Sequence, residues 1–269
     1  MIPRHILIGV LAVPAYLLGA SPADAAVPSN DTITGATAIT TLPFLDTIDT
    51  TDAHTRADEL AAAQPCIAIG APAIEKAVWY RYTASANITL LVDTTASSYS
   101  TGIAAYHGTP SPSTFGGCAP VRLTTSVAGG ETAYLMVFGD MPGSPGGTLR
   151  ITVQEPPPPP QVSLSVDATG TFDPRSGSAS VGGTFTCTGV ADFSGIQGQL
   201  TQTVGRFSVS GFFSTSAPCD GVEHAWTAQA TPQNGKFAGG PATVQAFGFA
   251  CNAGGCGQAK VTRQVRLSR

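Results

Sequence analysis

The stretch AVWYRYTASANITLLVDTT, residues 77–95, decides the fold class of the first half of the chain. Val78, Tyr80 and Tyr82 alternate with Trp79, Arg81 and Thr83. After a Ser-Ala-Asn turn, the apolar alternation resumes at Ile88. A period of two residues is the pattern of a β-strand with one buried face. The stretch therefore predicts two strands of a scaffold joined by a tight turn.

Short strands separated by turns recur along the whole chain. In the first half, the segments TGIAAYH, TAYLMVFG and TLRITV are strand-like and lie between Gly and Pro turns. In the second half, SVGGTFTC, GRFSVSGFF and PATVQAFGFA show the same organisation. The helix-like stretch RADELAAA is too short to change the fold class. The sequence predicts an all-β protein with two antiparallel β-sandwiches.

A run of prolines divides the chain. The segment EPPPPPQ, residues 155–161, contains five prolines and must be extended polyproline II, spanning about 15 Å without internal hydrogen bonds. Such a run cannot lie inside a sheet, because proline has no backbone N–H to donate. The sequence therefore predicts two folding units, residues 27–154 and 162–269, joined by a semi-rigid linker.

The first unit resembles a known bacterial domain. The pieces NDTITGATAITTLPFLDTIDTTDA, VWYRYTA, VDT, YHG and TAYLMVFG follow one another as in pre-peptidase C-terminal (PPC) type domains, over residues 29–154. The resemblance implies a jelly-roll-like β-sandwich that serves secreted hydrolases and surface proteins as an accessory module for binding or secretion. Relatives often carry an aspartate shortly after VDT. Ser100 stands there in this chain, which argues against a calcium site at that position.

The second unit has its own pattern. About seven strand-like segments in residues 162–269 predict an immunoglobulin-like sandwich. The skeleton C…PCDG…W…C…C resembles that of small secreted β-sandwich domains of actinobacteria, some of them without known function. We expect Trp226 to be the core tryptophan of this sandwich.

Residues 1–25 have the three parts of a secretory signal peptide. Arg4 precedes the apolar run ILIGVLAVPAYLLGA, and an Ala-x-Ala cleavage pattern ends at Ala25. The apolar run is too short to span a bilayer, so no membrane anchor is expected. We expect a mature chain that starts at Ala26 or Val27 and is secreted and extracellular, or periplasmic if the host has an outer membrane.

Composition narrows the range of partners. Charged residues make up 11% of the chain, and the net charge is −4. Without a basic patch, the protein is not expected to bind nucleic acid. The expected partner is a polysaccharide or a cell-surface protein, and the expected oligomeric state is a monomer.

Six cysteines in an exported chain predict three disulfides. Two cysteines lie in the first unit and must pair with each other if bridges stay within units. The other four allow three pairings, of which we favour the one that closes the short NAGG loop. A zinc site would need a second ligand pair of suitable spacing, so bridges are preferred. The predicted pairs are Cys66–Cys118, Cys187–Cys219 and Cys251–Cys256.

The sequence contains no recognised catalytic motif. His54, His107 and His224 lie within or beside turn-rich segments, with His107 in a hairpin loop, and none belongs to a motif with a nucleophile. The acidic stretch LDTIDTTD, residues 45–52, either binds a hard cation such as calcium or forms a solvated turn. We predict no catalytic residue, no metal site and no cofactor.

Trp79 is the candidate ligand-binding residue. In a regular strand its ring points away from the face of Val78 and Tyr80. A flat aromatic ring on an outer sheet face suits stacking on a sugar. The alternative is that Trp79 packs under a loop or a neighbouring strand.

Two classes of function follow from the sequence. The favoured one is a secreted, non-enzymatic binding or surface-associated accessory protein whose ligand is a carbohydrate or a protein. The alternative is an unrecognised secreted hydrolase, or an inhibitor or escort of one. A hydrolase would be recognised by a catalytic triad, a carboxylate pair or metal ligands on loops.

Overall fold

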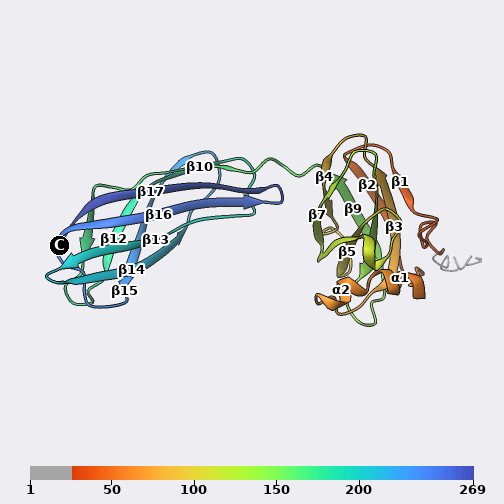
Figure 1. Cartoon of the computed structure of the whole chain (residues 1–269), viewed down its shortest axis with the longest axis horizontal. Helices are drawn as coiled ribbons and strands as arrows, with labels where there is room; N and C mark the ends of the chain where they lie inside the picture. Colours follow the sequence, from red (N-terminus) through yellow and green to blue (C-terminus); the bar gives the residue numbers. More distant parts are fainter. Residues whose placement is uncertain (1–25) are drawn as a thin grey trace, which may run out of the picture.

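The computed structural model describes residues 26–269, so the expected signal peptide, residues 1–25, lies outside the described part of the chain. The described chain is all-β and forms two β-sandwiches joined by the polyproline segment (Figure 1). Every strand pairing lies within residues 37–154 or within residues 161–268. No helix of this part of the chain is long and apolar enough to cross a membrane.

Two sheets face each other in the first unit. The five-stranded sheet has the order β1-β3-β8-β5-β6, and the four-stranded sheet has the order β2-β9-β4-β7. The strands of the larger sheet are β1 (Thr37–Ile39), β3 (Glu75–Thr83), β5 (Thr101–His107), β6 (Phe115–Pro120) and β8 (Thr132–Gly139). Those of the smaller sheet are β2 (Phe44–Asp49), β4 (Ile88–Asp93), β7 (Arg122–Val127) and β9 (Thr148–Gln154). All neighbours are antiparallel except β1 and β3.

The core of the first unit lies between these two sheets. Its fully buried side chains include Val78 of β3, Leu90 of β4, Ile103 of β5 and Val153 of β9. The strand alternation in residues 77–95 places β3 and β4 on this core as the sequence predicts.

The opposite face of the five-stranded sheet is covered as well. Two short helices, α1 (Ala57–Ala62) and α2 (Gln64–Ala68), contribute Ala62 and Cys66 to a second cluster of buried side chains on this face (Figure 1). A 3₁₀-helix, Pro112–Thr114, precedes β6. The larger sheet is therefore buried on both faces.

The second unit is a sandwich whose layers are joined at their sides. One layer contains β10 (Gln161–Leu164), β11 (Thr169–Phe172), β12 (Ala179–Thr188) and β15 (Glu223–Pro232). The other contains β13 (Phe193–Val204), β14 (Phe207–Ser216), β16 (Gly240–Asn252) and β17 (Gly255–Ser268). Short pairings of β11 with β17 and of β14 with β15 connect the layers, so the strands form one continuous sheet.

Trp226 lies in the core of the second unit, as predicted. It is 5% exposed and stacks on Phe213 of the other layer, with ring centroids 5.9 Å apart. Its Nε1 donates to the carbonyl oxygen of Ser165 at 3.1 Å. Fully buried Phe185 and Leu200 belong to the same cluster.

All six cysteines are paired in the described chain. The bridges have the pairing that the sequence predicts: Cys66–Cys118, Cys187–Cys219 and Cys251–Cys256. The first joins α2 to β6, the second joins β12 to the segment after β14, and the third joins β16 to β17 beside their turn. Each bridge lies within one unit.

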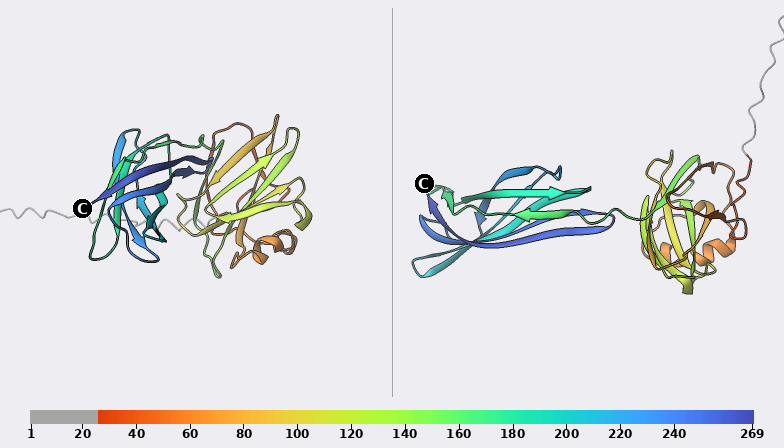
Figure 2. Two further views of the ribbon diagram at one scale, coloured as in Figure 1. Left: turned by 60° about the vertical axis from the view of Figure 1, so that its left-hand side comes forward. Right: turned by 90° about the horizontal axis from the view of Figure 1, so that it is seen from above.

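The polyproline segment contacts the second unit. Asn252 Nδ2 donates to the carbonyl oxygens of Pro158 and Val190, each at 2.8 Å. A Cβ atom on Gly254 would lie 1.9 Å from the carbonyl oxygen of Pro157, so only glycine fits there. Figures 1 and 2 both show the β16–β17 hairpin pointing toward the first unit. The linker is thus held against this hairpin as well as being stiff in itself.

Candidate binding groove

The structure corrects the assignment of Trp79 as a ligand-binding surface residue. Its ring points away from the core that contains Val78, as the strand pattern predicts, but its exposed fraction is 0%. The ring packs against Tyr106, with centroids 5.8 Å apart, and Nε1 donates to Glu59 Oε1 at 2.8 Å. Because helix α1 covers this face of the sheet, Trp79 cannot stack on a ligand.

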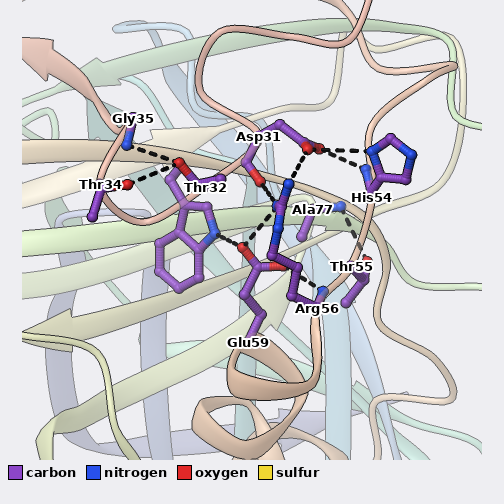
Figure 3. Close-up of polar contacts among 10 residues, drawn as sticks. Asp31, Thr32, Thr34, Gly35, His54, Thr55, Arg56, Glu59 and Ala77 are labelled. Atoms are coloured by element: carbon purple, nitrogen blue, oxygen red, sulfur yellow. Dashed lines mark hydrogen bonds and ion pairs between the residues drawn. The ribbon is translucent and has the colours of Figure 1, made fainter.

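A polar cluster holds this cover in place (Figure 3). Arg56 Nη2 donates to Asp31 Oδ2 at 2.7 Å, and the backbone N–H of Arg56 donates to Glu59 Oε2 at 2.7 Å. Burial would raise the pKa of Asp31, but hydrogen bonds from His54 and Arg56 outweigh it and lower that pKa. Burial raises the pKa of Glu59. The cluster joins the segment before β1 to the start of helix α1, and its role is to stabilise the fold.

The histidines of the described chain lie beside carboxylates in three separate places. The pairs are His54 with Asp31 at 3.3 Å, His107 with Glu131 at 3.1 Å and His224 with Asp220 at 2.9 Å. His107 is the last residue of strand β5 and not part of a hairpin loop, which corrects the prediction. Within residues 26–269, no hydrogen bond joins a histidine ring to a Ser, Thr or Cys side chain, so no nucleophile–base pair is formed.

The acidic stretch of residues 45–52 forms a strand edge and a turn. Asp46 Oδ2 accepts from the Tyr80 hydroxyl at 3.0 Å. Asp49 Oδ1 accepts from the backbone N–H and the hydroxyl of Thr51 at 2.9 and 2.6 Å. In the part of the chain that the structure describes, no group of three or more His, Cys, Asp or Glu side chains is placed to hold a metal ion.

An open groove of about 720 Å³ lies on the outer face of the second unit. It crosses β14, β13, β16 and β17, and β15 borders it. Its position follows from the period of two in these strands, because Leu200 and Val244 point inward and are fully buried while their neighbours point outward. The outward side chains that line it include Gln197, Gln199, Phe212, Gln245, Phe247 and Lys260.

The strand register arranges the outward side chains in two rows. From β14 through β13 and β16 to β17, one row is Phe212, Gln199, Gln245 and Thr262, and the other is Ser214, Gln197, Phe247 and Lys260. Neighbouring strands lie about 4.8 Å apart, so four strands give each row a length of about 14 Å. The first row therefore combines an aromatic ring with two glutamine amides, and the second combines an aromatic ring with one.

The glutamine amides in these rows are available to a ligand. Within residues 26–269, no hydrogen bond uses the side chains of Gln197, Gln199 or Gln245. The buried Gln202 behaves differently, because its amide donates to the carbonyl oxygen of Ala238 at 2.8 Å and accepts from the Ala238 N–H at 2.9 Å. The amides of the groove keep their capacity to donate and to accept.

Aromatic surface continues from the groove toward the end of the sheet. Phe249 stacks on Phe247 with centroids 6.1 Å apart, and Phe193 meets Phe249 edge-on at 6.3 Å. Phe193 is 60% exposed and Phe212 is 54% exposed. Large apolar rings on a solvent-facing sheet are a common sign of a binding face.

The groove residues were missed at the level of sequence. Alternation in the segments IQGQL and TVQAFGF already places their glutamines and phenylalanines on one face of each strand. The missing information was that β13 lies between β14 and β16, which brings the two segments together. A search for outward-facing Gln and aromatic residues within each strand would have found the signal.

Part of the chain matches a known family. Residues 160–256 match the model of a family of unknown function, DUF6299. The matched residues include the groove side chains of β13, β14 and β16 but not Lys260. None of the curated proteins matches the chain. The resemblance of residues 29–154 to the PPC domain stays a prediction.

Several solved structures share a weak similarity with the chain. A GH2 beta-galacturonidase from Eisenbergiella tayi, bound to glycerol, has a TM-score of 0.25 and 8% identity, over 71% of this chain and 35% of that one. A beta-glucuronidase from Parabacteroides merdae has the same TM-score and identity, over 71% of this chain and 27% of that one. A protein from Eubacterium rectale, provisionally described as secreted, has a TM-score of 0.23 and 11% identity, over 82% of this chain and 71% of that one. The chain spans about a third of the two glycosidases.

Proposed function

We propose that the protein is a secreted, non-enzymatic binding protein and that the groove of the second unit is its ligand-binding face. The observation that carries this proposal is the pair of rows across four strands, in which exposed Phe212 and half-buried Phe247 lie beside unpaired amides. Binding sites are typically concave and combine apolar surface with a few polar groups that orient the ligand.

The disulfides support export. All cysteines of the described chain are paired, and such bridges persist in oxidising compartments outside the cytosol. The extracellular location and the cleaved signal peptide are part of the same proposal, since residues 1–25 carry the expected leader.

The first unit supports the second as an accessory module. The PPC resemblance suggests this role, and the burial of both faces of its larger sheet agrees with a scaffold. The expectation that the protein is not an enzyme is part of the same proposal; each histidine ring of residues 26–269 lies beside a carboxylate, and none is hydrogen-bonded to a Ser, Thr or Cys side chain. The ligand is proposed to be a carbohydrate or a surface protein.

A retention assay tests the location of the binding face. Residues 26–269 are incubated with isolated cell walls, polysaccharides and surface-protein extracts of the source organism, and the bound fraction is measured. We expect Phe212→Ala to reduce retention. Phe207→Ala is the matched control, because Phe207 lies on the same strand, is 78% exposed and is outside the groove. Equal loss for both variants, or loss for neither, would place the binding face elsewhere.

A further inference from the structure

We infer, on the basis of the proposed function, that the ligand of this groove is an uncharged polysaccharide whose chain lies across strands β14, β13, β16 and β17. The groove has the three properties that such a ligand requires: amides that both donate and accept, flat aromatic rings, and almost no charge. The amides argue against a purely apolar ligand, and the low charge argues against a polyelectrolyte.

The amides match sugar hydroxyls. A glutamine side chain carries two N–H donors and one carbonyl acceptor, and a hydroxyl group both donates and accepts. Gln199 and Gln245 lie side by side in one row, and Gln197 lies in the other. Adjacent hydroxyls of one sugar ring can therefore meet adjacent amides. A purely apolar ligand would leave these amides without partners, at a cost in binding free energy.

The aromatic rings match the C–H faces of sugar rings. Phe212 on β14 and Phe247 on β16 are separated by β13, and they belong to different rows. Rings at staggered positions suit a polymer that contacts one ring and then the other along its length. Rows of about 14 Å give space for several linked sugars and are longer than a single small ligand needs.

The charge of the groove excludes polyelectrolytes. Lys260 is the only ionisable side chain among the residues that line it, and no carboxylate is among them. A nucleic acid or another polyanion is usually bound by several Lys and Arg side chains, each neutralising one charge. A strongly basic peptide would need carboxylates for the same reason. An uncharged chain needs neither.

The backbone of the groove floor argues against a peptide strand. Gln197 and Gln199 of β13 face partners on both β14 and β16, so the main chain of β13 is paired on both sides. A peptide that adds to a sheet requires an unpaired strand edge. The floor offers a ligand side chains only, which suits a glycan.

The test is a glycan array probed with residues 26–269, followed by titration of the best binder. We expect uncharged glycans to bind and the signal to persist in 0.5 M NaCl, since salt screens only charged contacts. Gln199→Ala and Phe247→Ala should each weaken binding by about tenfold, the loss of one central contact. Phe207→Ala should bind as wild type, and thermal unfolding shows that each variant is folded.

The outcomes separate the two proposals. Binding only to charged glycans with loss in 0.5 M NaCl, or to no glycan, would overturn the inference about ligand class. If a protein ligand is then retained by wild type and released by the groove variants, the binding face stands without the glycan. Any ligand that Gln199→Ala and Phe247→Ala bind as tightly as wild type would overturn the groove itself.

Discussion

The chain presents aromatic side chains on two sheet faces that look alike in sequence and differ in what covers them. Trp79 and Tyr106 lie on the face of the five-stranded sheet under helices α1 and α2, and both have an exposed fraction of 0%. Phe212 and Phe247 lie on the face of the second unit that carries the open groove, and Phe212 is 54% exposed. The alternation of side chains along a strand determines on which face of the sheet a ring lies. A segment distant in sequence, here helices α1 and α2, determines whether that face is open to solvent. Of these two aromatic faces, only the one in the second unit is open to solvent.

The largest expected effect is a loss of stability at the covered face. Trp79→Ala should destabilise the first unit by about 3–5 kcal/mol, because it empties a fully buried site and leaves the Glu59 carboxyl without its indole donor. Differential scanning calorimetry measures this. A change below about 1 kcal/mol would mean that the ring is not packed as described.

The second effect concerns the disulfides. Replacing Cys187 and Cys219 with Ala should cost about 2–5 kcal/mol. Replacing Cys251 and Cys256 should cost less, because their sequence separation is 5 residues against 32 and a shorter loop constrains less entropy. Chemical unfolding of both double variants gives the comparison. A greater loss for the short loop would contradict this order.

A smaller effect concerns the polar cluster of the covered face. Asp31→Asn should cost about 1–3 kcal/mol at neutral pH, because Arg56 loses its buried charged partner. The pKa of Asp31 in the folded protein lies below the ordinary value of 3.8. The carboxylate therefore contributes its full share to the free energy of unfolding above pH 3.8, and this contribution is lost as the pH falls through the folded pKa.

Thermal unfolding from pH 7 to pH 2 checks this sign. The difference in melting temperature between wild type and Asp31→Asn should narrow below about pH 4. A difference that stays constant or widens as the pH falls would show that the Asp31 carboxylate does not stabilise the fold.

The smallest expected effect on stability is at the open face. Phe212→Ala should change the free energy of unfolding by no more than about 0.5 kcal/mol, because the ring is largely exposed. The same substitution should reduce ligand retention. Calorimetry of Phe212→Ala beside Trp79→Ala therefore sharpens the contrast between a ring that packs in a core and a ring that is proposed to bind a ligand. A cost near that of Trp79→Ala would contradict it.

Much of the fold could be predicted from the sequence, because strands and turns are local patterns. The alternation around Val78 and Leu90 places two core strands, and Trp226 is the expected core residue of the second unit. The cysteine pairs followed from unit boundaries and loop length.

The candidate site could not be predicted in the same way. The exposure of Trp79 depends on whether residues 56–68 fold back over its sheet, which alternation in β3 does not encode. The groove likewise depends on β13 lying between β14 and β16, which brings together residues about 50 positions apart such as Gln197 and Phe247. Contacts between distant segments decided both outcomes.

The most direct test of the open and covered faces is a two-dimensional ¹H–¹⁵N spectrum of residues 26–269, recorded while the protein is titrated with the best-binding glycan from the array. One spectrum reports the side-chain amides of Gln197, Gln199 and Gln245 together with the indole N–H groups of Trp79 and Trp226. We predict that the three glutamine signals shift with increasing ligand and that both indole signals stay in place. A shift of the Trp79 indole with the glutamine signals unmoved would contradict the account, because it would put the ligand on the face that the helices cover.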